Sequence, residues 1–404
     1  MPDALPAFSA YGIELEYMLV DRDTLNVRPI ADRLLADLPS SSGLVDCSNE
    51  LVNHVIEIKN PVPTDLRKLA AAFQQQIRHL NARLAAYNAC LLPTAMHPWM
   101  NPERETALWP YDDAGIYSTF DALFDCKRHP WANVQSMHIN LPFANDDEFE
   151  RLHTAVRMLL PILPAIAASS PIADGKSTGY LDYRMHVYRD QSPSQPRIVG
   201  DIIPEVVKSP SEYTSQILAP MYRDIAPLDT QHSLRFEWLN ARGAIARFAR
   251  NAIEIRVMDV QECPAADIAL AALVIDTVHA LYHQQFSTLA TQQSLPGTML
   301  SDLLAHCCRE ADASLIEAPL YLAAWGYPGE ACCAAKLWHH IGEMLQHRSP
   351  HANLWRRHLD YVLEYGPLAR RILRHTGENP TVHGLGNTYR SLTHKLDSAT
   401  LMSP

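Results

Sequence analysis

The chain has 404 residues, of which 47% are hydrophobic and 20% are charged, and its formal net charge is −11. This composition is typical of a globular protein with enough apolar material for one large domain or two closely packed ones. An acidic chain lacks the basic surface that meets nucleic-acid phosphates, so the composition argues against a nucleic-acid partner.

Cysteine usage and the chain start predict a cytoplasmic protein. The eight cysteines form no C-x-x-C pair, which argues against a zinc framework and favours reduced thiols. The first ten residues lack the basic and apolar regions of a signal peptide. The longest apolar stretch contains Asp267, Asp276 and His279, which are costly in a bilayer, so it predicts a buried helix and no membrane partner.

The first 170 residues predict three strands, two helices and one irregular stretch. Residues 11–20, 54–59 and 133–143 alternate like strands. Apolar residues at helical spacing predict helices over 65–90, which Thr64 would cap, and over 146–170, which Pro161 and Pro164 would bend. The aromatic, proline-bearing segment 97–133 predicts an irregular surface.

The rest of the chain is predicted to contain one further strand and many helices. Segment 171–232 is rich in Pro, Ser and Gly and is typical of a binding loop or lid. Residues 251–260 form the clearest strand, and Pro264 begins a helix that runs to Phe286. Residues 299–376 are predicted to be helical, and the polar tail 377–404 is expected to dock loosely.

The strands alternate apolar and polar residues rather than being apolar throughout. Alternation favours an antiparallel sheet with one face on helices and one face open, and it disfavours a doubly wound parallel sheet. The predicted fold class is therefore α+β.

The polar faces of four strands carry an unusual set of side chains. Successive side chains in a strand point to opposite faces, so apolar residues take one face and the intervening residues take the other. The residues on the second face are Glu14, Glu16, Glu57, His138, Glu254 and Arg256. For any one strand, a solvated face is the simplest interpretation, but ordinary solvated faces mix Lys, Thr, Ser and Glu.

Several carboxylates on one central face would repel one another unless cations neutralise them. Carboxylate oxygens with a histidine suit Mg²⁺ or Mn²⁺, and an arginine beside them suits a phosphate. The chain has neither G-x-x-x-x-G-K-[ST] nor G-x-G-x-x-G. If ATP binds, metals and arginines must therefore hold its phosphates in place of a glycine-rich loop.

Five motifs in order resemble the family-2 glutamate–cysteine ligases and related carboxylate–amine ligases. They are "GIELE" (12–16), "NELVNHVIEI" (49–58), "SMHINLP" (136–142), "DGKSTGYLDYR" (174–184) and "ARFARNAIEIRVMD" (246–259). The resemblance covers roughly residues 9–285. It implies a glutamine-synthetase-like fold, in which an antiparallel sheet forms a funnel with helices on its outer face and with ATP and metals at its base.

The resemblance also implies roles for individual residues. The metal ligands would be Glu14, Glu16, Glu50, Glu57, His138 and Glu254. Glu57 would also contact the cofactor, and the odd spacing from Glu50 to Glu57 places Glu50 in a turn or past a bulge. Arg256 would contact phosphate, Arg184 would lie in a substrate loop, and Arg247 and Arg235 would neutralise a transferring phosphate.

The chain departs from the family pattern around His138. The family commonly has a second histidine two residues earlier and a glycine–valine pair after it, where this chain has Ser136, Asn140 and Leu141.

The implied activity is ATP- and Mg²⁺-dependent amide formation through an acyl phosphate, as in glutathione biosynthesis, with glutamate and an amine such as that of cysteine as substrates. Two alternatives stay open: a guanidino-kinase-like phosphotransferase of the same fold, and a relative that binds ATP or metal without turnover. Residues 1–290 would form the catalytic domain, and the helical region 291–404 would pack on it. A homodimer is also left open.

Overall fold

The computed structural model describes the chain except for residues 1–3, 39–44, 63–64, 112–113, 230–231 and 378. Its centre is an antiparallel sheet of seven strands in the order β2-β3-β1-β5-β9-β8, with β4 also paired to β1. The strands are β1 (Gly12–Asp21), β2 (Asp46–Asn49), β3 (Val55–Lys59), β4 (Ala89–Leu92), β5 (Ser136–Pro142), β8 (Ala244–Arg247) and β9 (Ala252–Asp259). This confirms the predicted α+β class.

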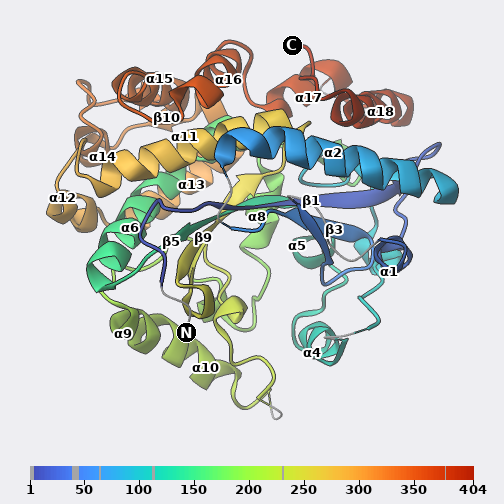
Figure 1. Cartoon of the computed structure of the whole chain (residues 1–404), viewed down its shortest axis with the longest axis horizontal. Helices are drawn as coiled ribbons and strands as arrows, with labels where there is room; N and C mark the ends of the chain where they lie inside the picture. The colour runs from blue at the N-terminus through green and yellow to red at the C-terminus, as the bar shows by residue number, and fades with distance from the viewer. Residues whose placement is uncertain (1–3, 39–44, 63–64, 112–113, 230–231, 378) are drawn as a thin grey trace.

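The period of two decides which strand residues enter the core. In β1, the residues Ile13, Leu15, Tyr17 and Leu19 are fully buried and belong to the main hydrophobic cluster. Their face is covered by α2 (Leu66–Leu84), α6 (Asp146–Leu159) and α11 (Pro264–Tyr282), and α11 packs against the other two helices. Figure 1 shows α2 and α11 crossing the sheet on one side.

The sequence predicted that the opposite face of the sheet is open. In the structure that face is largely covered. Figure 1 shows α4 (Ala114–Phe124), α5 (His129–Ala132), α8 (Tyr183–Tyr188), α9 (Pro210–Tyr213) and α10 (Ala219–Ile225) on this side. The side chains that cover the sheet come from segments 97–133 and 171–232. Both segments contain short helices instead of the irregular surface and loop that were predicted, and residues such as His97 and Met100 are fully buried.

The C-terminal boundary of the helix predicted over 65–90 needs correction. Helix α2 ends at Leu84, where a short 3-10 helix (Ala85–Tyr87) and the left-handed Asn88 turn the chain into β4, so residues 89–90 are not helical. The short strands β2 and β8 were also not predicted. Thr64 lies outside the described residues, and Asp65 caps α2 by accepting a hydrogen bond from the Arg67 N–H.

The predicted bend in helix 146–170 is confirmed. Helix α6 ends at Leu159, a 3-10 turn (Leu160–Ile162) follows, and α7 (Pro164–Ala167) restarts at the second proline. A proline inside a helix removes one hydrogen bond and clashes with the preceding turn, which explains the break.

The C-terminal part is helical, as predicted, but its tail does not dock loosely. The helices are α12 (Leu289–Ser294), α13 (Gly297–Glu310), α14 (Pro319–Ala324), α15 (Ala334–Leu345), α16 (Ala352–Tyr365), α17 (Leu368–Thr376) and α18 (Val382–Ser398). Helix α18 packs on β4 and α2, and its Tyr389, Leu392 and Leu396 are fully buried. Apolar burial on this scale fixes the tail in place.

Two further small helices and two small ribbons complete the described α-helices and strands: α1 (Ala31–Ala36), α3 (Pro102–Glu105), β6–β7 (Ile172–Ala173 and Lys176–Ser177) and β10–β11 (Leu315–Ile316 and Cys332–Cys333). Among the described helices, only α11 is long and apolar enough to cross a membrane, and 89% of its most apolar stretch is buried inside the protein. The division of the chain near residue 290 stays a prediction.

Candidate active site

The register of the sheet brings the predicted carboxylates and His138 together. Glu14 in β1 lies opposite Lys59 in β3 and opposite His138 in β5. Glu16 lies opposite Glu57 of β3. On the other side of β5, Asn140 lies opposite Glu254 of β9. The four central strands β3, β1, β5 and β9 therefore present one continuous row of polar side chains.

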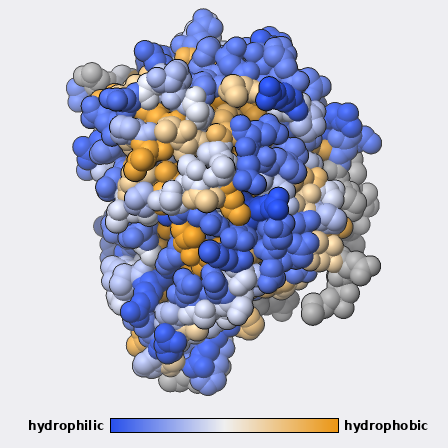
Figure 2. Space-filling view, turned by 90° about the vertical axis from the view of Figure 1, so that its left-hand side faces the viewer, coloured by the Kyte–Doolittle hydropathy of each residue, from blue (hydrophilic) through white to orange (hydrophobic). Residues whose placement is uncertain are grey.

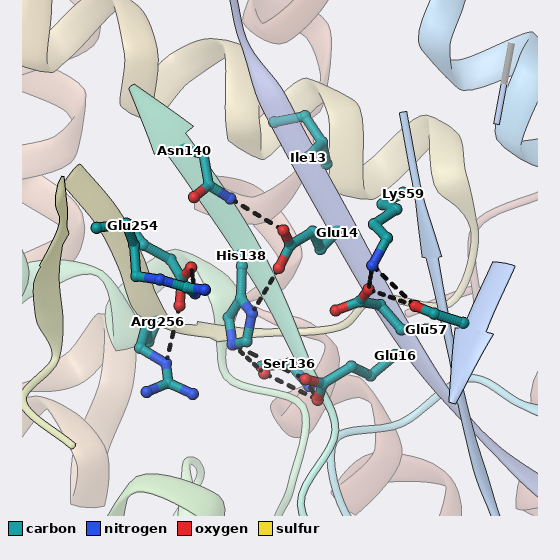
Figure 3. Close-up of polar contacts among 12 residues, drawn as sticks. Ile13, Glu14, Glu16, Glu57, Lys59, Ser136, His138, Asn140, Glu254 and Arg256 are labelled. Carbon is teal, nitrogen blue, oxygen red and sulfur yellow. Dashed lines mark hydrogen bonds and ion pairs between the residues drawn. The ribbon is translucent and has the colours of Figure 1, made fainter. Parts of the chain in front are cut away.

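His138 links the two glutamates of β1 (Figure 3). Its Nδ1 lies 3.2 Å from Glu14 Oε2, and its Nε2 lies 2.8 Å from Ser136 Oγ and 3.8 Å from Glu16 Oε1. Ser136 donates to Glu16 Oε2 from its backbone N–H at 2.6 Å and from its hydroxyl at 2.9 Å. Ser136 therefore fixes the Glu16 carboxylate. From the sequence, Ser136 was noted only because the family commonly has a histidine at that position.

Glu14 is reached by two further donors. Asn140 donates to its Oε1 at 3.3 Å, and Arg250 lies 3.4 Å from the same oxygen. Neither residue was among the predicted site residues. Asn140 could have been found, because it lies two residues after His138 and hence on the same strand face.

Glu57 is held by a lysine that the sequence analysis missed. Lys59 Nζ lies 2.5 Å from Glu57 Oε1 and 2.9 Å from Ser48 Oγ, and Ser48 donates to the same Glu57 oxygen at 2.7 Å. Lys59 follows Glu57 by two residues, so strand alternation alone would have placed it on this face.

Glu254 lies between two of the predicted arginines. Arg247 donates to its Oε2 at 2.6 Å across the β8–β9 hairpin, and Arg256 Nε lies 3.3 Å from its Oε1. Glu254 is only 1% exposed, whereas both arginines retain some exposure. The two cations therefore extend from a buried anion toward the accessible part of the site.

The surroundings shift the pKa values of the glutamates in and beside the row in different directions. Burial would raise the pKa of Glu14, but the hydrogen bond and charge of His138, with Arg250 and Lys59, lower it to about 2. Burial raises the pKa of Glu16 against the opposing influence of His138 and Ser136. Burial and the charges of Glu16 and Glu57 raise the pKa of Glu50 well above its ordinary value.

Arg184 lies near the row, but its guanidinium already pairs with Asp259. Its Nε donates to Asp259 at 2.5 Å, and its two terminal nitrogens lie 3.3 Å from the backbone carbonyl of Arg256. Asp259 is further fixed by the Ser169 N–H and the Ser170 hydroxyl. Arg184 therefore supports the β9 backbone beside Arg256 while lining the adjoining cavity.

Arg235 makes no described contact with the carboxylate row, although it was a predicted site residue. It lies before the 3-10 helix Glu237–Leu239. Burial would raise the pKa of Asp229, but hydrogen bonds from Leu234 and Ser233 and the charge of Arg235 lower it. In the described part of the chain, no hydrogen bond or ion pair joins Arg235 to a carboxylate of the row.

Two cavities adjoin the row, one beside Glu14 and one beside Glu16 of β1. A cavity of about 130 Å³ is lined by Glu16, Glu50, Trp131, Arg184, Tyr188 and Arg256, among others. A cavity of about 320 Å³ is lined by Glu14, Lys59, Asn140 and Arg250 together with apolar residues that include Val62 and Pro142. The glutamates of β1 thus separate two chemically different spaces.

Glu50 lies directly after β2, outside the regular strand that holds Glu57, and it lines the smaller cavity with Glu16. Glu50 is half-buried, and no described residue hydrogen bonds to its carboxylate. A partly desolvated carboxylate without a donor is stabilised when a proton or a cation is supplied.

The described residues contain no group of three His, Cys, Asp or Glu side chains already gathered around one point. The carboxylates instead contact lysine, arginine, histidine, serine and asparagine donors. The donor set still fits a divalent cation, because five carboxylates and one imidazole are the ligand types that Mg²⁺ and Mn²⁺ take, and no described residue donates a hydrogen bond to the Glu50 carboxylate.

The chain is similar in sequence to several known proteins. An uncharacterized protein of Archaeoglobus fulgidus is 37% identical over 270 residues, which cover 65% of this chain and 72% of that protein. A protein of Bradyrhizobium sp. named as a glutamate–cysteine ligase 2 is 24% identical over 68% of this chain and 62% of its own length.

A solved structure also shares the fold. The crystal structure of glutamate–cysteine ligase from Francisella tularensis in complex with AMP matches with a TM-score of 0.62 and 13% identity, over 96% of this chain and 89% of that one. The family model for glutamate–cysteine ligase family 2 matches residues 10–305, which contain every predicted site residue, and the chain belongs to that family.

Proposed function

We propose that the protein is an ATP- and Mg²⁺-dependent carboxylate–amine ligase that joins the γ-carboxyl group of glutamate to an amine such as that of cysteine. The observation that carries the proposal is the row of buried carboxylates on β1, β3 and β9, bordered by arginines and adjoined by two cavities, one beside Glu14 and one beside Glu16. Membership of the glutamate–cysteine ligase family supports the reaction class.

In this proposal the two cavities receive different substrates. The larger cavity combines apolar walls with Lys59 and Arg250, which suits a nucleotide base and its phosphates. The smaller cavity presents Arg184 and Arg256 beside Glu16, which suits an amino acid of about its own size. The two substrates would then meet over Glu14 and Glu16, which lie between the cavities.

The reaction has two steps. An oxygen of the substrate carboxylate attacks the γ-phosphorus of ATP, the bond between the β and γ phosphates breaks, and ADP leaves. The amine then attacks the acyl carbon, loses a proton, and displaces phosphate to form the amide.

The protein's own contribution is positioning and charge compensation. Arg256 and Arg247 project from Glu254 and would approach the transferring phosphate, where fixed cations stabilise developing negative charge. Arg256 is held in place by Glu254 and by the Asn240 carbonyl at 3.4 Å. Orienting both reactants against these groups removes much of the entropic cost of the encounter.

The row would hold the metal through Glu14, Glu16, Glu50, Glu57, His138 and Glu254. When bound, Mg²⁺ supplies neutralisation of phosphate charge and a template for the two reacting groups. 

The test is a screen for ADP release with ATP, Mg²⁺, glutamate and a panel of amines. Each positive pair is examined by mass spectrometry for amide and by a colour assay for free phosphate. Equal amounts of ADP, amide and phosphate are expected. A phosphorylated acceptor without free phosphate would instead indicate a phosphotransferase, and failure to bind Mg²⁺, Mn²⁺ and ATP would overturn the proposal.

A further inference from the structure

Apolar side chains line part of the cavity beside Glu16. They are Leu51, Val52, Val55, Pro130, Trp131 and Val134, here called the apolar wall. On the side of the molecule shown in Figure 2, which carries α12 and α14 in Figure 1, hydrophobic surface is divided by hydrophilic residues, as is usual for protein surfaces. Six apolar side chains around one small cavity are less usual, so a ligand there must offer them an apolar group.

The apolar wall comes from two segments that are fastened together. One segment, 51–55, connects β2 to β3, and the other, 130–134, runs from α5 toward β5. The Nε2 of His54 lies 2.7 Å from the carbonyl oxygen of Ala132, and both residues are buried. Val52 and Val55 also share a hydrophobic cluster with Ala132. The two segments therefore form one continuous wall.

Trp131 gives the wall a fixed shape. Its Nε1 donates to the Gln191 carbonyl at 2.9 Å. Its ring stacks on Phe124 with the centroids 5.6 Å apart, and the ring of Phe120 lies 5.3 Å away. Trp131 and Val134 are only half-buried, so both keep accessible surface beside the cavity. The wall is therefore present before any ligand binds.

The remaining lining of the cavity belongs to the carboxylate row. Glu16, Ser136, His138 and Arg256 line the same cavity from β1, β5 and β9 (Figure 3). These polar groups suit glutamate, which is charged at both ends. Glutamate has no apolar group at either end to cover the wall, and burial of a charge against apolar side chains is costly.

The size of the cavity excludes the nucleotide as the ligand of the wall. Its volume is about 130 Å³, whereas sites for drug-sized ligands occupy roughly 300–1,000 Å³. The acceptor amine must lie next to glutamate, because its nitrogen attacks the acyl carbon. The group that the amine carries is therefore the part of the substrates that is left for the apolar wall.

We propose, on the basis of the ligase reaction proposed above, that the acceptor is a primary amine that carries a small aliphatic group, and that this group packs on Trp131 and Val134. Glutamate then occupies the polar part of the cavity, beside Glu16 and Arg256. The aliphatic group is favoured over one with a hydroxyl at the same place, because apolar side chains cannot form hydrogen bonds with that hydroxyl.

The test compares two pairs of amines in which a methyl group replaces a hydroxyl of similar size: valine with threonine, and isobutylamine with 1-amino-2-propanol. ADP release and amide formation are measured on the full chain with ATP, Mg²⁺ and glutamate. In the pair that reacts, kcat/KM is expected to be about tenfold to a hundredfold higher for the methyl member. Which pair reacts shows whether the acceptor also carries a carboxylate. Equal rates within each pair, or turnover only with amines that lack a small aliphatic group, overturn the inference.

Val134→Thr places a hydroxyl on the wall without changing its shape. It is expected to reduce the preference for the methyl member about fivefold or more, while the KM for ATP stays within about twofold and the melting temperature stays near that of the wild type. Val382→Thr is the matched control, because Val382 is 88% exposed, and it should leave the preference unchanged. A preference that Val134→Thr leaves unchanged while the KM for ATP rises would assign the wall to the nucleotide and overturn the inference.

Trp131→Phe is a second variant, which enlarges the cavity and keeps an aromatic ring for the contact with Phe124. It is expected to raise the kcat/KM of the acceptor that is one methylene longer, leucine against valine or isoamylamine against isobutylamine, about fivefold or more. An unchanged ratio would show that the aliphatic group does not contact Trp131, which overturns the inference.

Calorimetric titration with the same pairs, in the presence of glutamate and without ATP, separates this inference from the ligase reaction. Tighter binding of the methyl member without any ADP release would support the apolar wall as its site and overturn the ligase reaction. Amide formation without a preference for the methyl member would overturn the assignment of the wall and leave the ligase reaction standing.

Discussion

At the scale of single residues, Glu254 is the most constrained member of the row. It is 1% exposed and contacts Arg247 and Arg256 on its two oxygens. Its negative charge therefore both positions the arginines and, in the proposed reaction, contributes to the metal site.

Glu254→Gln is expected to lower the rate of ADP formation by about 10²–10³-fold, the usual cost of losing one preorganised electrostatic contact. The overall fold should persist, because the amide has the size of the carboxyl group. Steady-state ADP release and circular dichroism are the two measurements. The control is Glu103→Gln on an exposed helix. Undiminished turnover in Glu254→Gln would remove this residue from the site.

Arg250 is a site residue that the family comparison did not indicate. It is half-exposed at the mouth of the larger cavity and lies 3.4 Å from Glu14. If that cavity holds the nucleotide, its charge faces the phosphates.

Arg250→Gln is expected to raise the KM for ATP about tenfold or more while leaving the KM for glutamate within about twofold, since one charge-assisted hydrogen bond contributes roughly 1.5–3 kcal/mol. Initial rates at varied ATP and varied glutamate separate the two effects. The exposed Arg104→Gln serves as control. A change confined to glutamate would reverse the assignment of the two cavities.

At the scale of elements, the packing of α18 anchors the C-terminal segment to the rest of the protein. Helix α18 buries Leu385, Tyr389, Leu392 and Leu396 against β4 and neighbouring helices. In α17, Arg371 pairs with Glu262, and both residues are fully buried. The tail is therefore part of the core that also supports the end of β1.

Leu392→Ala is expected to lower the free energy of unfolding by about 2–5 kcal/mol, because it leaves a cavity among packed side chains. Val382→Ala, at the start of the same helix and 88% exposed, should change it by less than about 0.5 kcal/mol. Chemical denaturation of both variants tests this. Equal small effects would show that the tail is only loosely attached.

Short strands and the tail helix show where sequence patterns fail at this scale. β2, β4 and β8 have four residues each, too few for alternation to stand out. In α18 the apolar residues do repeat at helical spacing, but Gly384 and Gly386 lower its intrinsic helix propensity. Packing against the sheet compensates for that cost.

At the scale of the whole molecule, buried neutral histidines link stability to pH. Burial lowers the pKa of His54, His97 and His358 to about 4 each. In His97 the Nε2 contacts the Leu25 carbonyl at 2.7 Å, and the Nδ1 accepts the Trp99 N–H at 3.2 Å. A second proton on this ring would displace the Trp99 hydrogen bond.

The unfolded state binds these protons near pH 6.5, whereas the folded state resists them until about pH 4. The contribution of these histidines to the free energy of unfolding is therefore fully present above pH 6.5. It is lost as the pH falls toward 4, by up to roughly 3 kcal/mol for each histidine. Urea unfolding at several pH values should show this slope, and His97→Gln should flatten it. The exposed His383→Gln is the control; a slope that His97→Gln leaves unchanged would contradict the assignment.

The sequence by itself determined which side chains share a face of each strand, because alternation is local and follows from backbone geometry. It thereby placed Glu14, Glu16, Glu57, His138, Glu254 and Arg256 opposite the apolar core, and five ordered motifs identified the family. Lys59 and Asn140 obeyed the same rule and could have been included.

Only the tertiary structure decided which strands are neighbours and in what register, because pairing between distant segments depends on the packing of the whole sheet. That pairing placed His138 beside Glu14, Glu254 between two arginines, and Arg250 at the cavity mouth, whereas it left Arg235 outside. It also buried Arg157 against the carbonyls of Pro204 and Leu295, contacts that no local pattern in the sequence indicates.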